Sequence, residues 1–218
     1  MSLVHNCIIR SFNSIYQQAR YVKSSEYKDF VSYAYTCYQA LEAHHHGEEK
    51  FAFPEIEKAT GRKGLMEVNV AQHEAFYGGF NKWGEYLSSL SKGDASQISV
   101  ERFVGMMDAF LEPLSVHLND EIGTLLTLVE FGDQLDLEGI IAKETEQIMA
   151  KMNKTTEMPV FMLNHDLTYE SGLHTNFPPL PAFIKFFLMR VCPTVHYNWW
   201  KFATCDMSGR PKALYRAG

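Results

Sequence analysis

The chain has 218 residues, of which 46% are hydrophobic, and its 26 acidic and 20 basic side chains give a formal net charge of −6. No run of lysine or arginine forms a basic stripe, which argues against nucleic acid as a partner. No apolar stretch approaches the roughly 18–20 residues of a membrane span, and the first residues lack the pattern of a secretory signal. The four cysteines are scattered without a CxxC pair, which predicts a reduced, cytoplasmic protein.

Long helices are predicted over the first 131 residues, where apolar side chains recur with a period near 3.6. The predicted helices cover residues 4–22, 27–53, 65–90 and 99–131. The second is expected to end at Pro54, because proline disrupts a helix interior. Four helices joined by short connections favour an all-α, antiparallel up-down four-helix bundle.

The chain changes character after this predicted bundle. A fifth helix is expected over residues 137–152, and beyond Pro159 the sequence is rich in proline and aromatic residues, with one short helix predicted over residues 182–191. We therefore divide the chain into a bundle (residues 1–131) and a C-terminal extension (residues 132–218) that packs on it. The extension is expected to cover an apolar outer face of the bundle, or in addition to close the mouth of a ligand cavity.

One histidine lies on the apolar face of each predicted bundle helix, and two of these histidines are followed four residues later by a glutamate. The residues are His5, His44, His73 and His117, with Glu48 and Glu121. Residues four apart on a helix point to the same side and can share one ion. His45, His46 and Glu49 are left outside this set because they could form a solvated face beside it, and the three histidines of the extension are interpreted as structural.

The pattern has a chemical consequence. Two carboxylates buried in a bundle core without partners would cost several kcal/mol each, and cations between them would remove that cost. Imidazoles with bridging carboxylates on inward helix faces are the ligands that bundles use for paired iron or manganese ions. Zinc is disfavoured, since the sequence has no HExxH motif and no Cys/His cluster.

Ordered motifs on all four helices resemble the hemerythrin-like (HHE cation-binding) family over residues 1–131. The motifs are His5-Asn6, His44-His45-His46-Gly47-Glu48-Glu49, Gln72-His73-Glu74 and His117-Leu118-Asn119-Asp120-Glu121. The remainder resembles the extension of fungal members of the family. The resemblance implies a non-haem di-iron site that binds or reacts with O2, with His5 and His44 on one iron and His73 and His117 on the other. Glu48 and Glu121 would bridge the two irons, and manganese could replace iron.

Tyr77 departs from the family pattern, which usually has a histidine four residues after His73. A phenol there could bind ferric iron, could hydrogen-bond to an iron-bound oxygen species, or could lie outside the site. In each case one iron would have fewer nitrogen ligands than in a reversible oxygen carrier, and an open coordination position is what a catalytic metal needs. Tyr77 is therefore the candidate catalytic residue.

The sequence thus favours a di-iron protein that uses O2 or a peroxide to oxidise a small organic substrate. The aromatic extension would then shape a dry pocket for that substrate. The alternatives are a non-enzymatic carrier or sensor of O2 or nitric oxide, an iron store, and an interaction domain in which the metal is only structural. Substrate turnover, reversible oxygenation and metal-dependent folding distinguish these three classes.

Overall fold

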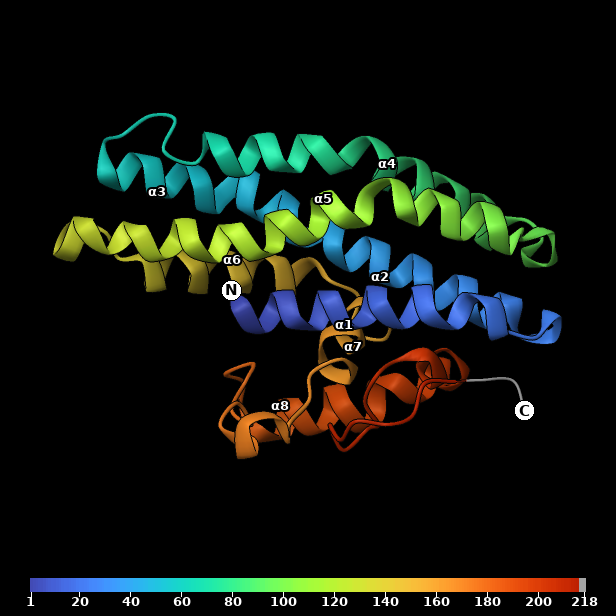
Figure 1. Cartoon of the computed structure of the whole chain (residues 1–218). Coiled ribbons are helices and arrows are strands. Elements are labelled where there is room, and N and C mark those ends of the chain that lie inside the picture. Colours follow the sequence, from blue (N-terminus) through green and yellow to red (C-terminus); the bar gives the residue numbers. More distant parts are fainter. Residues whose placement is uncertain (216–218) are drawn as a thin grey trace.

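A computed structural model describes residues 1–215 and shows the predicted all-α bundle (Figure 1). Its four long helices are α1 (Ser2–Gln18), α2 (Tyr27–Gly47), α4 (Glu67–Lys92) and α5 (Val100–Thr127). Successive long helices run in opposite directions, so the topology is up-down-up-down, as short connections require. No helix within residues 1–215 is long and apolar enough to cross a bilayer.

The second helical stretch does not end at Pro54, and this expectation was wrong. A π-helical segment, Glu48–Ala52, follows α2 directly, and α3 (Phe53–Thr60) carries the proline in its first turn. The carbonyl oxygen of Glu48 accepts a hydrogen bond from the backbone N–H of Phe53, five residues on. This wider turn relieves the clash between a proline ring and the preceding helical carbonyl, and the helix continues to Gly61.

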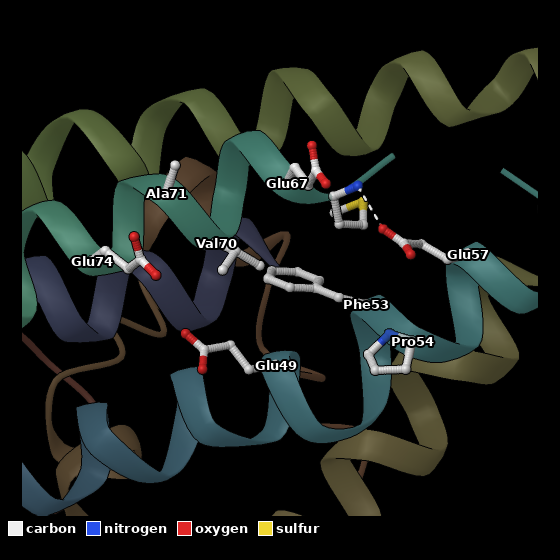
Figure 2. A pocket seen from close by; sticks show the side chains of 9 residues that line it. Glu49, Phe53, Pro54, Glu57, Glu67, Val70, Ala71 and Glu74 are labelled. Atoms are coloured by element: carbon white, nitrogen blue, oxygen red, sulfur yellow. Dashed lines mark hydrogen bonds between the residues drawn. The ribbon is translucent and has the colours of Figure 1, made fainter. Parts of the chain in front are cut away.

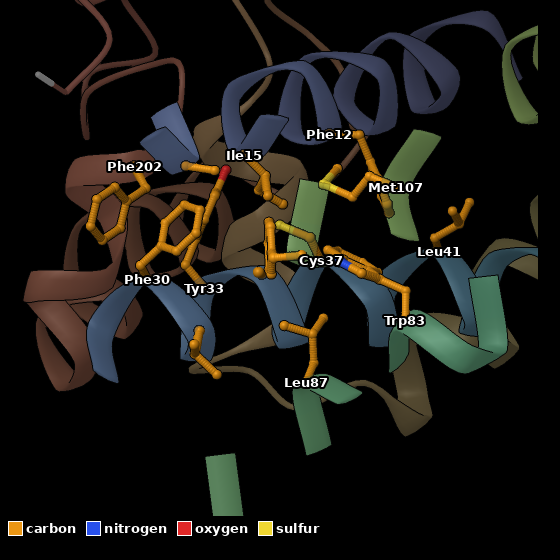
Figure 3. Packing of buried hydrophobic residues seen from close by; sticks show 14 of the residues in the cluster. Phe12, Ile15, Phe30, Tyr33, Cys37, Leu41, Trp83, Leu87, Met107 and Phe202 are labelled. Carbon is orange, nitrogen blue, oxygen red and sulfur yellow. The ribbon is translucent and has the colours of Figure 1, made fainter. Parts of the chain in front are cut away.

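Two apolar clusters fill the bundle on either side of a polar layer. The larger one is rich in aromatic side chains, including Phe12, Phe30 and Trp83 (Figure 3). The smaller one joins α3 to the start of α4 and the end of α5. On α5, for example, Leu118 belongs to the larger cluster and Leu125 packs against the smaller, with Glu121 between them. The polar layer is therefore enclosed by hydrocarbon at both ends.

A 3₁₀ segment, Leu128–Gln134, leads from the bundle into the extension, whose first helix, α6 (Leu137–Lys151), packs on α2 and on the π-helical segment. Its later elements are α7 (Glu157–Leu163), α8 (Ala182–Phe186), a π-helical segment (Phe187–Val191) and a 3₁₀ segment (Cys192–Phe202). In Figure 1 these later elements lie alongside α1.

The end of the extension enters the core of the bundle. Phe202 is fully buried, with its ring centroid 5.1 Å from that of Phe30 (Figure 3). The side-chain oxygen of Asn164, just after α7, accepts hydrogen bonds from the Tyr33 hydroxyl at 3.3 Å and from the backbone N–H of Thr204 at 3.1 Å. The bundle and its extension therefore share one hydrophobic core.

Not all aromatic residues of the extension are buried. Five of those described are exposed: Tyr169, Phe183, Phe186, Phe187 and Tyr197. Three of these residues lie on α8 and the π-helical segment after it, where their side chains point to solvent.

Candidate metal centre

The structure brings all six predicted ligand residues into the polar layer of the bundle. His5, His44, His73, His117, Glu48 and Glu121 are all buried, and the most exposed of them, His44, is only 5% accessible. The histidines come from α1, α2, α4 and α5 in turn, and Glu48 is the first residue of the π-helical segment. One turn of each bundle helix therefore contributes to a single layer.

The orientation of His5 leaves a bare nitrogen facing a carboxylate. Its Nδ1 lies 2.8 Å from the backbone carbonyl oxygen of Leu118. A carbonyl oxygen only accepts, so Nδ1 donates the hydrogen and Nε2 is the nitrogen that faces the centre. That Nε2 lies 3.1 Å from a carboxylate oxygen of Glu121. An imidazole nitrogen and a carboxylate oxygen arranged in this way can bind one cation between them.

In His73 and His117, too, Nδ1 is hydrogen-bonded to an outer partner and Nε2 faces the centre. His73 donates from Nδ1 to a Glu49 carboxylate oxygen at 2.7 Å, and His117 donates from Nδ1 to the Gln72 amide oxygen at 3.4 Å. Burial lowers the pKa of His117 to about 3 and that of His73 below its usual value, so both rings are neutral at pH 7. Their Nε2 atoms, both lone-pair acceptors, lie 3.0 Å apart. Such outer partners are what orient metal-binding imidazoles.

The donor atoms form two groups that share one residue. The groups are His5, His44 and Glu48, and His45, His73, His117 and Glu48, and the donor atoms of each group lie within 4.8 Å of one another. One oxygen of Glu48 lies 3.2 Å from Nε2 of His44, and the other lies 3.5 Å from Nε2 of His73. A carboxylate whose two oxygens face two different groups has the geometry of a bridge between two ions.

Glu121 also faces both groups. One of its oxygens lies 3.1 Å from Nε2 of His5 and 4.0 Å from Nε2 of His117. Burial and the nearby Glu121 carboxylate raise the pKa of Glu48 well above its usual value. No oxygen of either carboxylate has a hydrogen-bond partner within residues 1–215. Cations would remove both the repulsion and the missing partners, so the residues fit a metal pair.

His45 is the residue that the sequence interpretation left out of the ligand set, because it could have formed a solvated face. It is completely buried, and neither ring nitrogen has a hydrogen-bond partner among the described residues. Its ring centroid lies 4.4 Å from that of His73 and 5.1 Å from that of His117. The available signal was position on the helix: His45 follows buried Leu41 by one turn and precedes Glu48 by three residues. His46 is exposed, as expected.

Tyr77 lies at the edge of the second group. Its ring centroid is 5.7 Å from that of His73 and 6.2 Å from that of His45. Burial, reinforced by the carboxylates of Glu49 and Glu48, raises the pKa of the Tyr77 phenol above its usual value, so it is protonated at neutral pH. His45 supplies an imidazole on the side where Tyr77 stands in place of the expected histidine. The group with fewer imidazoles is consequently that of His5 and His44.

A surface cleft of about 480 Å³ lies beside the second group, between the π-helical segment and α3 on one side and α4 on the other (Figure 2). Phe53 and Val70 give it an apolar floor, and Glu49 and Glu74 stand at its edge. Glu49 also holds His73, and the ring centroids of Phe53 and His73 lie 5.7 Å apart. The cleft is thus separated from the buried donor atoms by little more than the His73 ring and Glu49.

Comparison with known proteins bears on this centre. The model of the hemerythrin HHE cation binding domain matches residues 1–129. "Dimeric xanthone biosynthesis cluster protein R11" from Cryptosporiopsis sp. (strain 8999) is 39% identical over 216 residues, which cover 98% of this chain and 80% of that protein. No solved structure shows a significant match.

Proposed function

This chain belongs to the hemerythrin HHE cation-binding family, and we propose that it is a non-haem di-iron protein that uses O2 or a peroxide to oxidise a small organic molecule. The observation that carries the proposal is the pair of imidazole groups joined by Glu48. Neutral imidazoles and carboxylates suit iron, and manganese accepts similar ligands. An iron pair would supply the redox chemistry that O2 or peroxide activation requires.

The side chains around the two groups would act differently in this reaction. The His5 and His44 group offers fewer imidazoles, so we place the open coordination position there. Tyr77, at the edge of the other group, keeps its phenolic hydrogen at neutral pH and would donate it toward the centre. The buried layer excludes bulk water, which would favour oxidation of the substrate over loss of oxidant to solvent.

We propose an oxygenated aromatic molecule as the substrate class. The cleft beside Glu49 combines an apolar floor with carboxylates that accept hydrogen bonds, which suits an aromatic ring bearing hydroxyl groups. The relative's name associates that protein with dimeric xanthone biosynthesis, and xanthones are oxygenated aromatics. We place the reaction in the cytoplasm, since the four cysteines are unpaired in the described structure.

The test begins with metal content and continues with oxygen consumption. We expect two iron ions per chain after anaerobic loading, and substrate-dependent O2 uptake with an oxidised product. Tyr77→Phe should keep the metal content and slow the O2 reaction, because it removes only the hydroxyl group. A loaded protein that binds less than one metal ion per chain, or that never yields product with oxygenated aromatics, would contradict the proposal.

Burial of the centre favours one alternative, a carrier or sensor of O2 or nitric oxide. Every predicted ligand is buried, and a diatomic gas reaches such a layer more readily than an aromatic substrate does. A visible spectrum that changes reversibly with O2 pressure, without product, would identify this function. A centre that is inert to O2 and whose removal unfolds the chain would instead identify a structural metal.

A further inference from the structure

Helix α6, which lies beyond the matched residues 1–129, packs directly on the turn that carries the metal centre. The contact is at Gly47, between the histidines of α2 and Glu48. A Cβ atom on Gly47 would lie 2.4 Å from Cδ1 of Ile148 and 3.0 Å from a carboxylate oxygen of Glu144. The extension therefore approaches this turn so closely that a larger residue at position 47 would make the Ile148 side chain shift, and it brings Glu144 with it.

Glu144 is a buried acid without a visible partner. It is 3% exposed, and its Oε1 has no hydrogen-bond partner within residues 1–215. Burial, followed by the charge of Glu121, raises the pKa of Glu144 to about 8. The N-terminal amine is the one positive charge that opposes this shift, but no ion pair within 4.0 Å joins the two in the described structure. A buried carboxyl in this state destabilises the fold unless a cation binds near it.

The contact with Gly47 places Glu144 beside the part of the centre that His44 and Glu48 form. Gly47 lies three residues after His44 and directly before Glu48, and an oxygen of Glu144 would lie 3.0 Å from a Cβ atom on it. His44 belongs to the donor group with fewer imidazoles, and Glu144 belongs to neither group. Glu144 is therefore a neighbour of that group rather than one of its donors.

We propose that Glu144 of α6 is a third carboxylate of the metal centre and stabilises the ion held by His5 and His44. The inference rests on the proposed metal binding. Glu48 and Glu121 provide two negative charges for two cations that carry at least four positive charges, and Glu144 provides a third in the same dry layer. The extension would then add negative charge beside a centre whose six predicted ligands all lie within the matched residues 1–129.

The test compares Glu144→Gln with Glu146→Gln, an exposed glutamate on the same helix. Loss of iron to a chelator should be at least about tenfold faster in Glu144→Gln and unchanged in Glu146→Gln, which is the size of effect seen when partners of a metal site are removed. The metal-free Glu144→Gln protein should unfold at the same or a higher temperature than the parent, because the glutamine amide carries no charge to bury.

The two measurements together separate a metal role from a structural one. If Glu144→Gln lowers the unfolding temperature of the metal-free protein, Glu144 acts through packing or through the N-terminal amine, and the inference is overturned. It is also overturned if the variant retains iron as well as the parent does. A parent that binds no iron would overturn the proposed function itself, which the metal content shows before any variant is made.

Discussion

At the scale of single residues, the centre is defined by the hydrogen bonds that fix each imidazole. Leu118, Glu49 and Gln72 take the Nδ1 hydrogens of three histidines and leave their Nε2 lone pairs inside. Periodicity predicted which histidines share a layer, because it requires only the helical repeat. It could not predict His45, since a residue 100° away on a helix reads as polar surface until neighbouring helices are placed around it.

The same residues predict how the metal-free protein responds to pH. The four buried histidines His44, His45, His73 and His117 of the polar layer have lowered pKa values, so the folded state loses stability as pH falls below about 6.5. Glu144, with its pKa raised to about 8, and Glu48 resist ionisation in the folded state, so stability also falls as pH rises from about 4.5 to 8. The histidines outnumber the acids where the two ranges overlap, which places the maximum at about pH 6.5.

Thermal unfolding of chelator-treated protein between pH 4.5 and 9 measures this profile. Iron loading should flatten the decline above the maximum, because cations favour the ionised carboxylates. A metal-free profile that keeps rising to pH 9 would show that these acids have partners in solution.

At the scale of elements, the prediction that was wrong is the helix end at Pro54, in the turn between α2 and α3. Proline normally ends a helix, and from sequence alone a π-helical turn that accommodates it is indistinguishable from a helix end. The turn carries Glu48, and Gly47 precedes it. The consequence for the site is that Glu48 belongs to a segment that packs on one side against α6.

Gly47→Ala tests that contact. Alanine is the better helix former, but its Cβ would clash with Ile148. We expect a net loss of about 1–3 kcal/mol in urea unfolding, as in other overpacked sites. Gly123→Ala on α5, where a Cβ meets nothing within 4 Å, should instead stabilise by about 0.5–1 kcal/mol.

A second substitution identifies the clash. Ile148→Ala removes Cδ1 and Cγ1, the two atoms that the new Cβ would meet at 2.4 and 2.9 Å, so Gly47→Ala with Ile148→Ala should be more stable than the sum of the two single changes predicts. Strictly additive losses would show that the helices are farther apart than the structure places them.

At the scale of the whole molecule, the composition of the extension predicted that it packs on the bundle, but could not show how deeply. Prolines and aromatics indicate ordered contact without specifying which side chains are inserted. In the structure Phe202 lies in the core, and the Ser14 hydroxyl and the Gln18 amide both donate to its carbonyl oxygen. Phe183, of the same residue type, is 74% exposed.

This arrangement predicts that bundle and extension unfold together. Phe202→Ala should lower the free energy of unfolding by about 3–5 kcal/mol, as expected for a large aromatic removed from a core, whereas Phe183→Ala should change it by no more than about 0.5 kcal/mol.

In both variants helix content and tryptophan fluorescence should report one coincident transition, because Trp83 of the bundle and Trp200 of the extension lie in the same cluster. Two separate transitions, or a Phe202→Ala protein as stable as the parent, would mean that the extension is an independent unit.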